Sequence, residues 1–143
     1  MGQLSQEAGD YVATGTHYLE NAGQFVSQKE LRKASELLWG AVSQYVKALA
    51  ATDGLLFTGH RQIRNYVRQS SIERHEPRLL RDFVLLEDLH RNFYDEKIAE
   101  DDFPVFLEAT QSFIDYLTQL IRSASDRTPT LAQSTPDTPP KPS

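Results

Sequence analysis

The sequence predicts an all-α protein, built as an antiparallel bundle of four to five helices. Apolar residues recur at helical spacing along most of the chain, and no segment alternates with the period of two that a strand requires. Glycine and proline interrupt the pattern at a few places and divide it into segments of helical length. At 143 residues the chain has the size of a single domain and can bury a core.

The first two helices are predicted to meet at about residues 27 and 28. The first runs from about Leu4 to Val26, and its glycines, Gly9 and Gly15, each cost about 1 kcal/mol relative to alanine, so it must depend on packing. The second begins near Gln28 and ends at Asp53-Gly54, because glycine adopts the left-handed exit conformation at low cost. Its apolar positions are Leu31, Ala34, Leu38, Ala41, Val42, Tyr45 and Leu49, widened by Leu37, Trp39 and Val46.

Three further helices complete the predicted bundle. A short third helix follows Thr58 and ends before Pro77. Proline disfavours helix at the preceding residue and suits a first turn, so a fourth helix is predicted from Pro77 to Tyr94. The last helix begins after an N-cap at Asp101 or Asp102. It has the most regular apolar stripe, formed by Phe103, Phe106, Leu107, Thr110, Phe113, Ile114, Leu117, Leu120 and Ile121.

Composition changes at Ser125, where a segment rich in proline, serine and threonine begins. We therefore predict a folded domain over residues 1–124 and a disordered tail over 125–143. The absence of cysteine excludes disulfides and cysteine nucleophiles and fits a reducing compartment. No apolar run reaches the length of a membrane span, and the first residues do not resemble a signal peptide. We expect a soluble cytoplasmic protein without a membrane partner.

Charge is distributed unevenly along the chain. The net charge of −5 argues against a general nucleic-acid binder. Between Thr58 and Arg81, however, six arginines minus two glutamates give +4, which leaves −9 for the remainder. Arg61, Arg64 and Arg68 share one face of the third helix. Either neighbouring acids neutralise this face, or it binds an anionic ligand such as RNA or a nucleotide, or it meets the acidic surface of a partner protein.

Two segments, "KASELLWGAVSQYVKAL" (residues 33–49) and "LHRNFYDE" (residues 89–96), carry a resemblance to a known family. With the helical pattern over about residues 15–122, they make the chain resemble the PaREP-like branch of the HEPN superfamily. The resemblance implies an antiparallel bundle, frequent dimerisation, RNA or nucleotide binding or RNA cleavage, and roles in toxin–antitoxin or defence systems. A nucleotidyltransferase is then a candidate partner protein. "SELLWGAV" also resembles the first helix of a tetratricopeptide repeat, but the repeat does not recur.

The catalytic pattern of the superfamily is missing at its expected position. Catalytic members resemble one another in an arginine that precedes a histidine by four to six intervening residues, which pairs a cation with a base. If His90 is that histidine, the arginine should occupy 83, 84 or 85, which are Phe83, Val84 and Leu85. We therefore expect a non-enzymatic module. The alternative is a small metal-independent ribonuclease with a degenerate or relocated active site.

His90 itself has three interpretations. It is a structural anchor that hydrogen-bonds a buried carbonyl or carboxylate, or it edges a phosphate-binding groove with Arg91 and Tyr94, or it is a catalytic base. The candidate residues for binding an anion or nucleic acid are Arg61, Arg64, Arg68, Arg91 and Tyr94. No metal or nucleotide motif occurs, so we expect no metal and no cofactor. The apolar surface of the second and last helices, Trp39 included, exceeds one core face, which predicts a homodimer.

Overall fold

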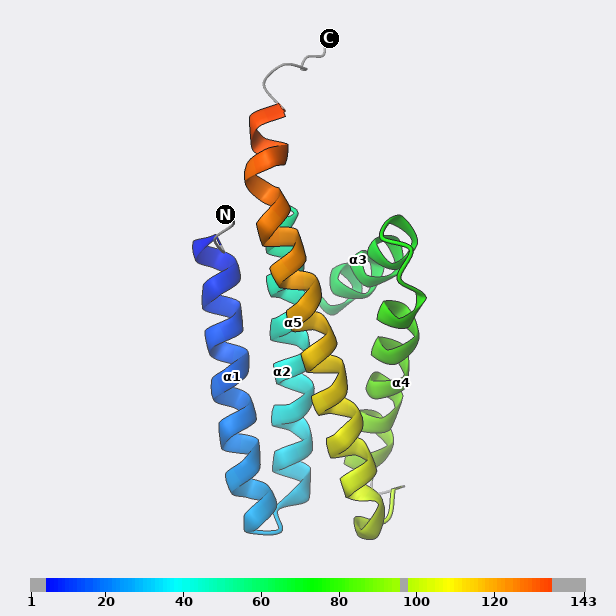
Figure 1. The fold of residues 1–143 in the computed structure, drawn as a ribbon. Helices are drawn as coiled ribbons and strands as arrows, with labels where there is room; N and C mark the ends of the chain where they lie inside the picture. The colour runs from blue at the N-terminus through cyan, green and yellow to red at the C-terminus, as the bar shows by residue number, and fades with distance from the viewer. Residues whose placement is uncertain (1–4, 96–97, 135–143) are drawn as a thin grey trace.

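The computed structural model describes residues 5–95 and 98–134, and it confirms the all-α class: within these ranges every regular element is a helix. The elements are α1 (Gln6–Ser27), α2 (Leu31–Thr52), α3 (His60–Glu73), α4 (Pro77–Tyr94), the 3-10 turn η1 (Glu100–Asp102) and α5 (Phe103–Ser134). The four long helices stand side by side with consecutive ones antiparallel, and the short α3 lies inclined at one end between α2 and α4 (Figure 1).

Helix α2 is the centre of the core. It contacts α1, α3, α4 and α5, and residues on several sides of it are buried. The apolar stripe predicted for α5 packs against it, with Phe106, Phe113 and Leu117 fully enclosed. At the opposite end from α3, Phe93 of α4 lies 5.0 Å from Phe103, measured between ring centroids. Burial of these aromatic rings accounts for much of the core's apolar area.

Three helices end in a left-handed residue: Lys29 (φ 61°), Gly54 (φ 79°) and His75 (φ 56°). In each case the next N–H donates to a carbonyl five residues earlier, in the pairs Glu30 to Phe25, Leu55 to Ala50 and Glu76 to Ser71. Only the glycine was predicted from the sequence. The side chains of Lys29 and His75 make this conformation costly by about 1 to 2 kcal/mol.

The predicted boundaries hold best where a proline or glycine sets them. Helix α4 has its predicted bounds, whereas α2 begins at Leu31, after a turn, and not near Gln28. Helix α5 continues past residue 124 to Ser134, and both Ala124 and Ser125 are buried. Residues 135–143, the rest of the predicted tail, lie outside the described residues. No helix in the described part of the chain is both long and apolar enough to cross a membrane.

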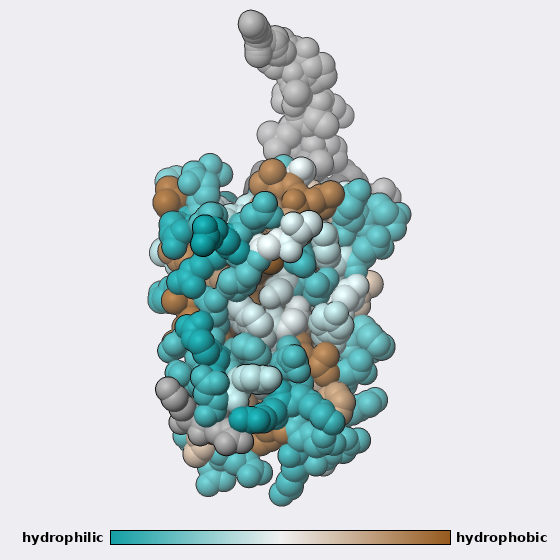
Figure 2. Space-filling view, turned by 180° about the vertical axis from the view of Figure 1, so that it is seen from behind, coloured by the Kyte–Doolittle hydropathy of each residue, from teal (hydrophilic) through white to brown (hydrophobic). Residues whose placement is uncertain are grey.

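Hydrophobic surface is dispersed over the molecule. Figure 2, a view from behind, shows hydrophobic residues in separate small patches among hydrophilic ones. The exposed large hydrophobic residues come from different elements: Leu55, Leu56, Ile72, Leu85, Tyr94 and Val105. Trp39 is not among them, because it packs within the chain. The expectation that Trp39 provides open apolar surface is therefore corrected.

Candidate functional site

Helices α3 and α4 are joined by a nearly buried carboxylate. Glu87 of α4 has an 11% exposed side chain and accepts hydrogen bonds from His60 Nε2 and Arg64 Nη1, both at 2.6 Å. His60 and Arg64 are one turn apart on α3, so they present their side chains to the same neighbour. A carboxylate in this position requires charged or hydrogen-bonded partners to offset its lost hydration. Through these two hydrogen bonds, Glu87 links the start of α3 to the middle of α4.

Neither Glu87 nor His60 was among the residues selected from the sequence. One signal was present, because Glu87 follows the buried Leu86 and lies one turn after Phe83 on the apolar side of α4. An acid at such a position implies a cationic partner on the helix that it faces.

An aromatic cluster lies beside this carboxylate and covers Trp39 of α2. The Trp39 ring lies 5.2 Å from Phe83, 6.4 Å from His60 and 5.8 Å from His90, with the His90 ring stacked at 18°. Trp39 is half-buried by these contacts. The tryptophan is therefore already part of the packing between α2, α3 and α4.

His90 contacts a buried hydroxyl. Its Nδ1 lies 3.3 Å from Oγ of Ser35, a residue with 0% exposure on α2. Burial lowers the pKa of His90 below its usual value, so the imidazole is predominantly neutral at pH 7. Because Ser35 is enclosed, this Ser–His pair offers no accessible nucleophile. The geometry favours the structural anchor, with a hydroxyl partner in place of the expected carbonyl or carboxylate.

The other candidate residues divide into two groups. Arg64 and Arg91 lie on one groove between α3 and α4, while Arg61 and Arg68 are exposed on α3, with Arg68 Nη1 3.3 Å from Asn65 Oδ1. Tyr94 lies elsewhere, at the end of α4, where the guanidinium of Arg32 stacks 5.5 Å from its ring. Tyr94 is therefore not a lining residue of the groove, although it follows Arg91 by about one turn and its ring lies 6.2 Å from that of His90.

The groove between α3 and α4 has a volume of about 370 Å³. Its floor is aliphatic, and its rim carries Arg81 and Arg91, whose side chains are 68% and 60% exposed and lie 3.3 Å from Asp82 and 3.4 Å from Asp88. Arg81 and Leu85 are lining residues that were not selected as site residues from the sequence. The complete lining is Arg64, Arg81, Val84, Leu85, Glu87, Asp88 and Arg91.

Arg74 and Arg78 join different elements of the fold, Arg74 by pairing with Asp53 and Arg78 by donating to Ser112 on α5. Arg74 Nη2 lies 3.0 Å from Asp53 Oδ2, which also accepts a 2.8 Å bond from the hydroxyl of Tyr66. Burial, reinforced by Asp53, raises the pKa of Tyr66, so the phenol stays protonated at neutral pH. Arg78 Nε binds Asp82 at 2.6 Å, and Arg81 shares that carboxylate at 3.3 Å.

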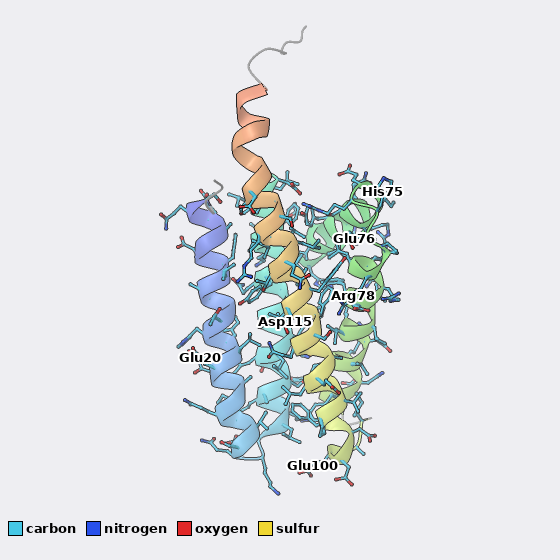
Figure 3. The ribbon with its side chains drawn as sticks, viewed as in Figure 1. Glu20, His75, Glu76, Arg78, Glu100 and Asp115 are labelled. Carbon is cyan, nitrogen blue, oxygen red and sulfur yellow. The ribbon has the colours of Figure 1, made fainter. Side chains whose placement is uncertain are left out.

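A second phenol is held at the start of α4. Figure 3 shows Glu76 and Arg78 there, near His75 in the turn before the helix. The hydroxyl of Tyr116 on α5 donates to Glu76 at 2.6 Å, and the Arg78 guanidinium lies 4.5 Å from the ring centroid. Burial, followed by the Glu76 carboxylate, raises the pKa of Tyr116. These contacts attach α4 to α5.

Among residues 5–95 and 98–134, no three side chains of histidine, aspartate or glutamate converge in a way that would hold an ion. The chemistry that the α3–α4 groove can offer is therefore that of guanidinium groups, one exposed carboxylate and an aliphatic floor.

Comparison with known proteins places the chain in one family. Residues 10–114 match the model of a family described as the archaeal PaREP1/PaREP8 family. No curated protein and no solved structure gives a significant match. The family match includes α2, α3 and α4, and so the whole groove.

Proposed function

The chain belongs to the archaeal PaREP1/PaREP8 family, and for this member we propose a non-enzymatic, HEPN-like binding function in which the α3–α4 groove holds an anionic partner. The observation that carries the proposal is the arrangement of the groove, with exposed arginines on its rim and Glu87 recessed below them. Guanidinium groups in such positions suit carboxylate or phosphate groups, which they bind through paired hydrogen bonds.

The local charge supports this function. The groove lining holds Arg64, Arg81 and Arg91 against Glu87 and Asp88, so three minus two gives +1, and Arg61 and Arg68 share the face of α3 that carries Arg64. The whole chain has a net charge of −5. An anionic partner is therefore attracted to this face and repelled by the rest of the molecule, which orients its approach.

Catalysis by His90 has little support in the geometry. Phe83 is fully buried, so the first position at which the superfamily pattern requires an arginine has no room for an exposed cation. His90 faces Ser35. These contacts explain both residues as packing elements.

A second candidate function is a ribonuclease with a relocated site at His60. Its exposed imidazole is held by Glu87 at 2.6 Å, as a carboxylate orients a catalytic histidine, and Arg64 lies beside it. Cleavage of single-stranded RNA without metal, lost in His60→Ala but kept in His90→Ala, would support this function. If the wild type leaves RNA intact, the second candidate is eliminated.

Two parts of the proposal rest on the resemblance to the HEPN superfamily: a role in a toxin–antitoxin or defence system, and a nucleotidyltransferase as partner protein. Homodimerisation rests on the resemblance and on the extent of apolar residues along α2 and α5. The resemblance also suggests which anions the groove would bind: RNA, which is polymeric, or a nucleotide, which is small. A monomeric mass in light scattering across the micromolar range would contradict the homodimer.

The test of the main function is polyanion binding followed by fluorescence anisotropy. Labelled polyglutamate and single-stranded RNA are titrated at about 50 and 200 mM salt, because affinity that depends on ion pairs falls with salt. The variant combines Arg61→Gln, Arg68→Gln and Arg81→Gln, and Arg64 is left intact because it pairs with Glu87. We expect binding to weaken at least about tenfold.

Arg122→Gln is the matched control, since Arg122 is an exposed arginine of α5 outside the groove. It should bind as the wild type does. Salt-independent binding, or equal affinity in the triple variant and the wild type, would refute the proposed function.

A further inference from the structure

We propose that the α3–α4 groove binds an acidic protein segment that inserts an aliphatic side chain between the arginines. This inference rests on the proposed function and specifies the partner as protein. It follows from three features of the groove: its floor, the position of its cations and the carboxylates within it.

The floor of the groove is an open aliphatic surface. Val84 and Leu85 line it, and Leu85 is 50% exposed although it lies in the middle of a helix. Arg81, Leu85 and Asp88 follow one another on one face of α4 at a spacing of three to four residues. An aliphatic side chain placed on Leu85 would lose its contact with water between charged neighbours. This is the arrangement of an anchor site in which a partner helix lies in a groove.

The cations lie on both sides of this anchor. Arg81 precedes Leu85 by one turn, and Arg91 follows it by about one and a half turns, so the two positions span about 15 Å along α4. Arg64 faces them from α3. A helical segment with one leucine or isoleucine, one glutamate about one turn to one side of it and another about one and a half turns to the other side matches the spacing of Arg81, Leu85 and Arg91.

A phosphodiester chain matches the groove less well. Proteins that hold single-stranded nucleic acid stack the bases on aromatic side chains, and no lining residue of this groove is aromatic. The nearby rings of Trp39, Phe83 and His60 pack against one another. Asp88 is exposed within the groove, 3.4 Å from Arg91 Nη2, and its carboxylate disfavours a continuous row of phosphates, whereas a protein segment can place a donor there.

The experiment compares three labelled probes by fluorescence anisotropy. The first is a short helical peptide with one leucine flanked by glutamates, the second has serine in place of that leucine, and the third is a single-stranded RNA of equal charge. For the wild type we expect the leucine peptide to bind at least about tenfold more tightly than either other probe.

Leu85→Ser tests the floor, and Ile72→Ser is its control, because Ile72 is an exposed aliphatic residue of α3 outside the groove. Leu85→Ser should remove the preference for the leucine peptide, and Ile72→Ser should keep it. Melting temperatures of both variants close to that of the wild type would show that the fold is intact.

The outcomes separate this inference from the proposed function. If all three probes bind equally and lose affinity in Arg81→Gln, the groove binds anions but the inference of an aliphatic anchor fails. Tighter binding of RNA than of the leucine peptide also overturns it. If no probe binds in a salt-dependent way, the proposed function fails as well.

Discussion

The pairs α1–α2 and α3–α4 each pack two consecutive helices against each other, but different chemistry joins each pair. In α1–α2, small residues let the helices approach closely: Gly15 of α1 lies against the ring of Tyr45, and Gly40 of α2 against that of Tyr18. In α3–α4 the closest contacts between side chains are ionic, centred on Glu87. The α1–α2 contact is made by small and aromatic residues. The α3–α4 contact is made by charged residues, and it lies beside a groove that arginines line.

The difference shows how the molecule separates stability from recognition. Close packing at the α1–α2 seam fixes helix positions, because a dense interface tolerates little change in volume. The α3–α4 seam depends on hydrogen bonds from the half-exposed His60 and Arg64 to the nearly buried Glu87, and such charged contacts respond to salt and pH. We expect the α3–α4 region to open more readily in hydrogen exchange than the α1–α2 region.

The largest effect is expected from removing the central carboxylate. Glu87→Ala leaves Arg64 and His60 without their shared acceptor and should destabilise the fold by about 1.5 to 3 kcal/mol. Urea unfolding of Glu87→Ala, Arg64→Ala and the double variant gives the coupling energy between the two side chains. Additive effects of the two substitutions would show that the ion pair does not join the helices.

Two glycines of α1 test how closely α1 packs against α2. A Cβ at Gly15 would lie 2.7 Å from the ring of Tyr45, whose hydroxyl is held by Thr16 at 2.9 Å. Gly15→Ala should therefore destabilise the protein by about 1 to 2 kcal/mol. A Cβ at Gly9 meets nothing within 4 Å. Gly9→Ala should stabilise the protein by up to about 1 kcal/mol, and equal melting temperatures of the two variants would contradict the close packing at Gly15.

His90 predicts a pH dependence of stability at the ionic side of the molecule. Burial lowers its pKa in the folded state, so the unfolded chain binds the proton more readily. Its contribution is complete above the unfolded pKa of about 6.5 and is lost as the pH falls toward the lowered folded pKa. The difference in unfolding free energy between wild type and His90→Gln should therefore grow as the pH rises toward about 6.5 and stay constant above it. Parallel curves would exclude His90 as the source.

The smallest effects are expected at the two helix ends that use a left-handed residue other than glycine. Lys29→Gly and His75→Gly remove the cost of a side chain at φ 61° and 56°, respectively. Each should stabilise the fold by about 0.5 to 1 kcal/mol, visible as a higher melting temperature. Gly54→Ala, at φ 79°, is the reverse control and should lower it.

Local signals in the sequence predicted most of the fold. Apolar residues at helical spacing identified the helices, Pro77 fixed the start of α4, and Gly54 marked the end of α2. These signals work because helix formation and termination depend on residues only a few positions apart. The uneven placement of arginines was equally visible, and it identified the segment that forms one side of the groove.

Only the tertiary structure decided which charges are paired. Arg64 meets Glu87 across 23 positions of the chain, and Arg74 meets Asp53 across 21. Such pairs depend on the rotation and crossing of whole helices, which no local pattern specifies. The same holds for Trp39. The sequence suggested that its ring adds to the exposed apolar surface, whereas the fold packs Phe83, His60 and His90 against it. The sequence by itself thus determined where helices form, and packing between helices determined which arginines remain on the rim of the groove.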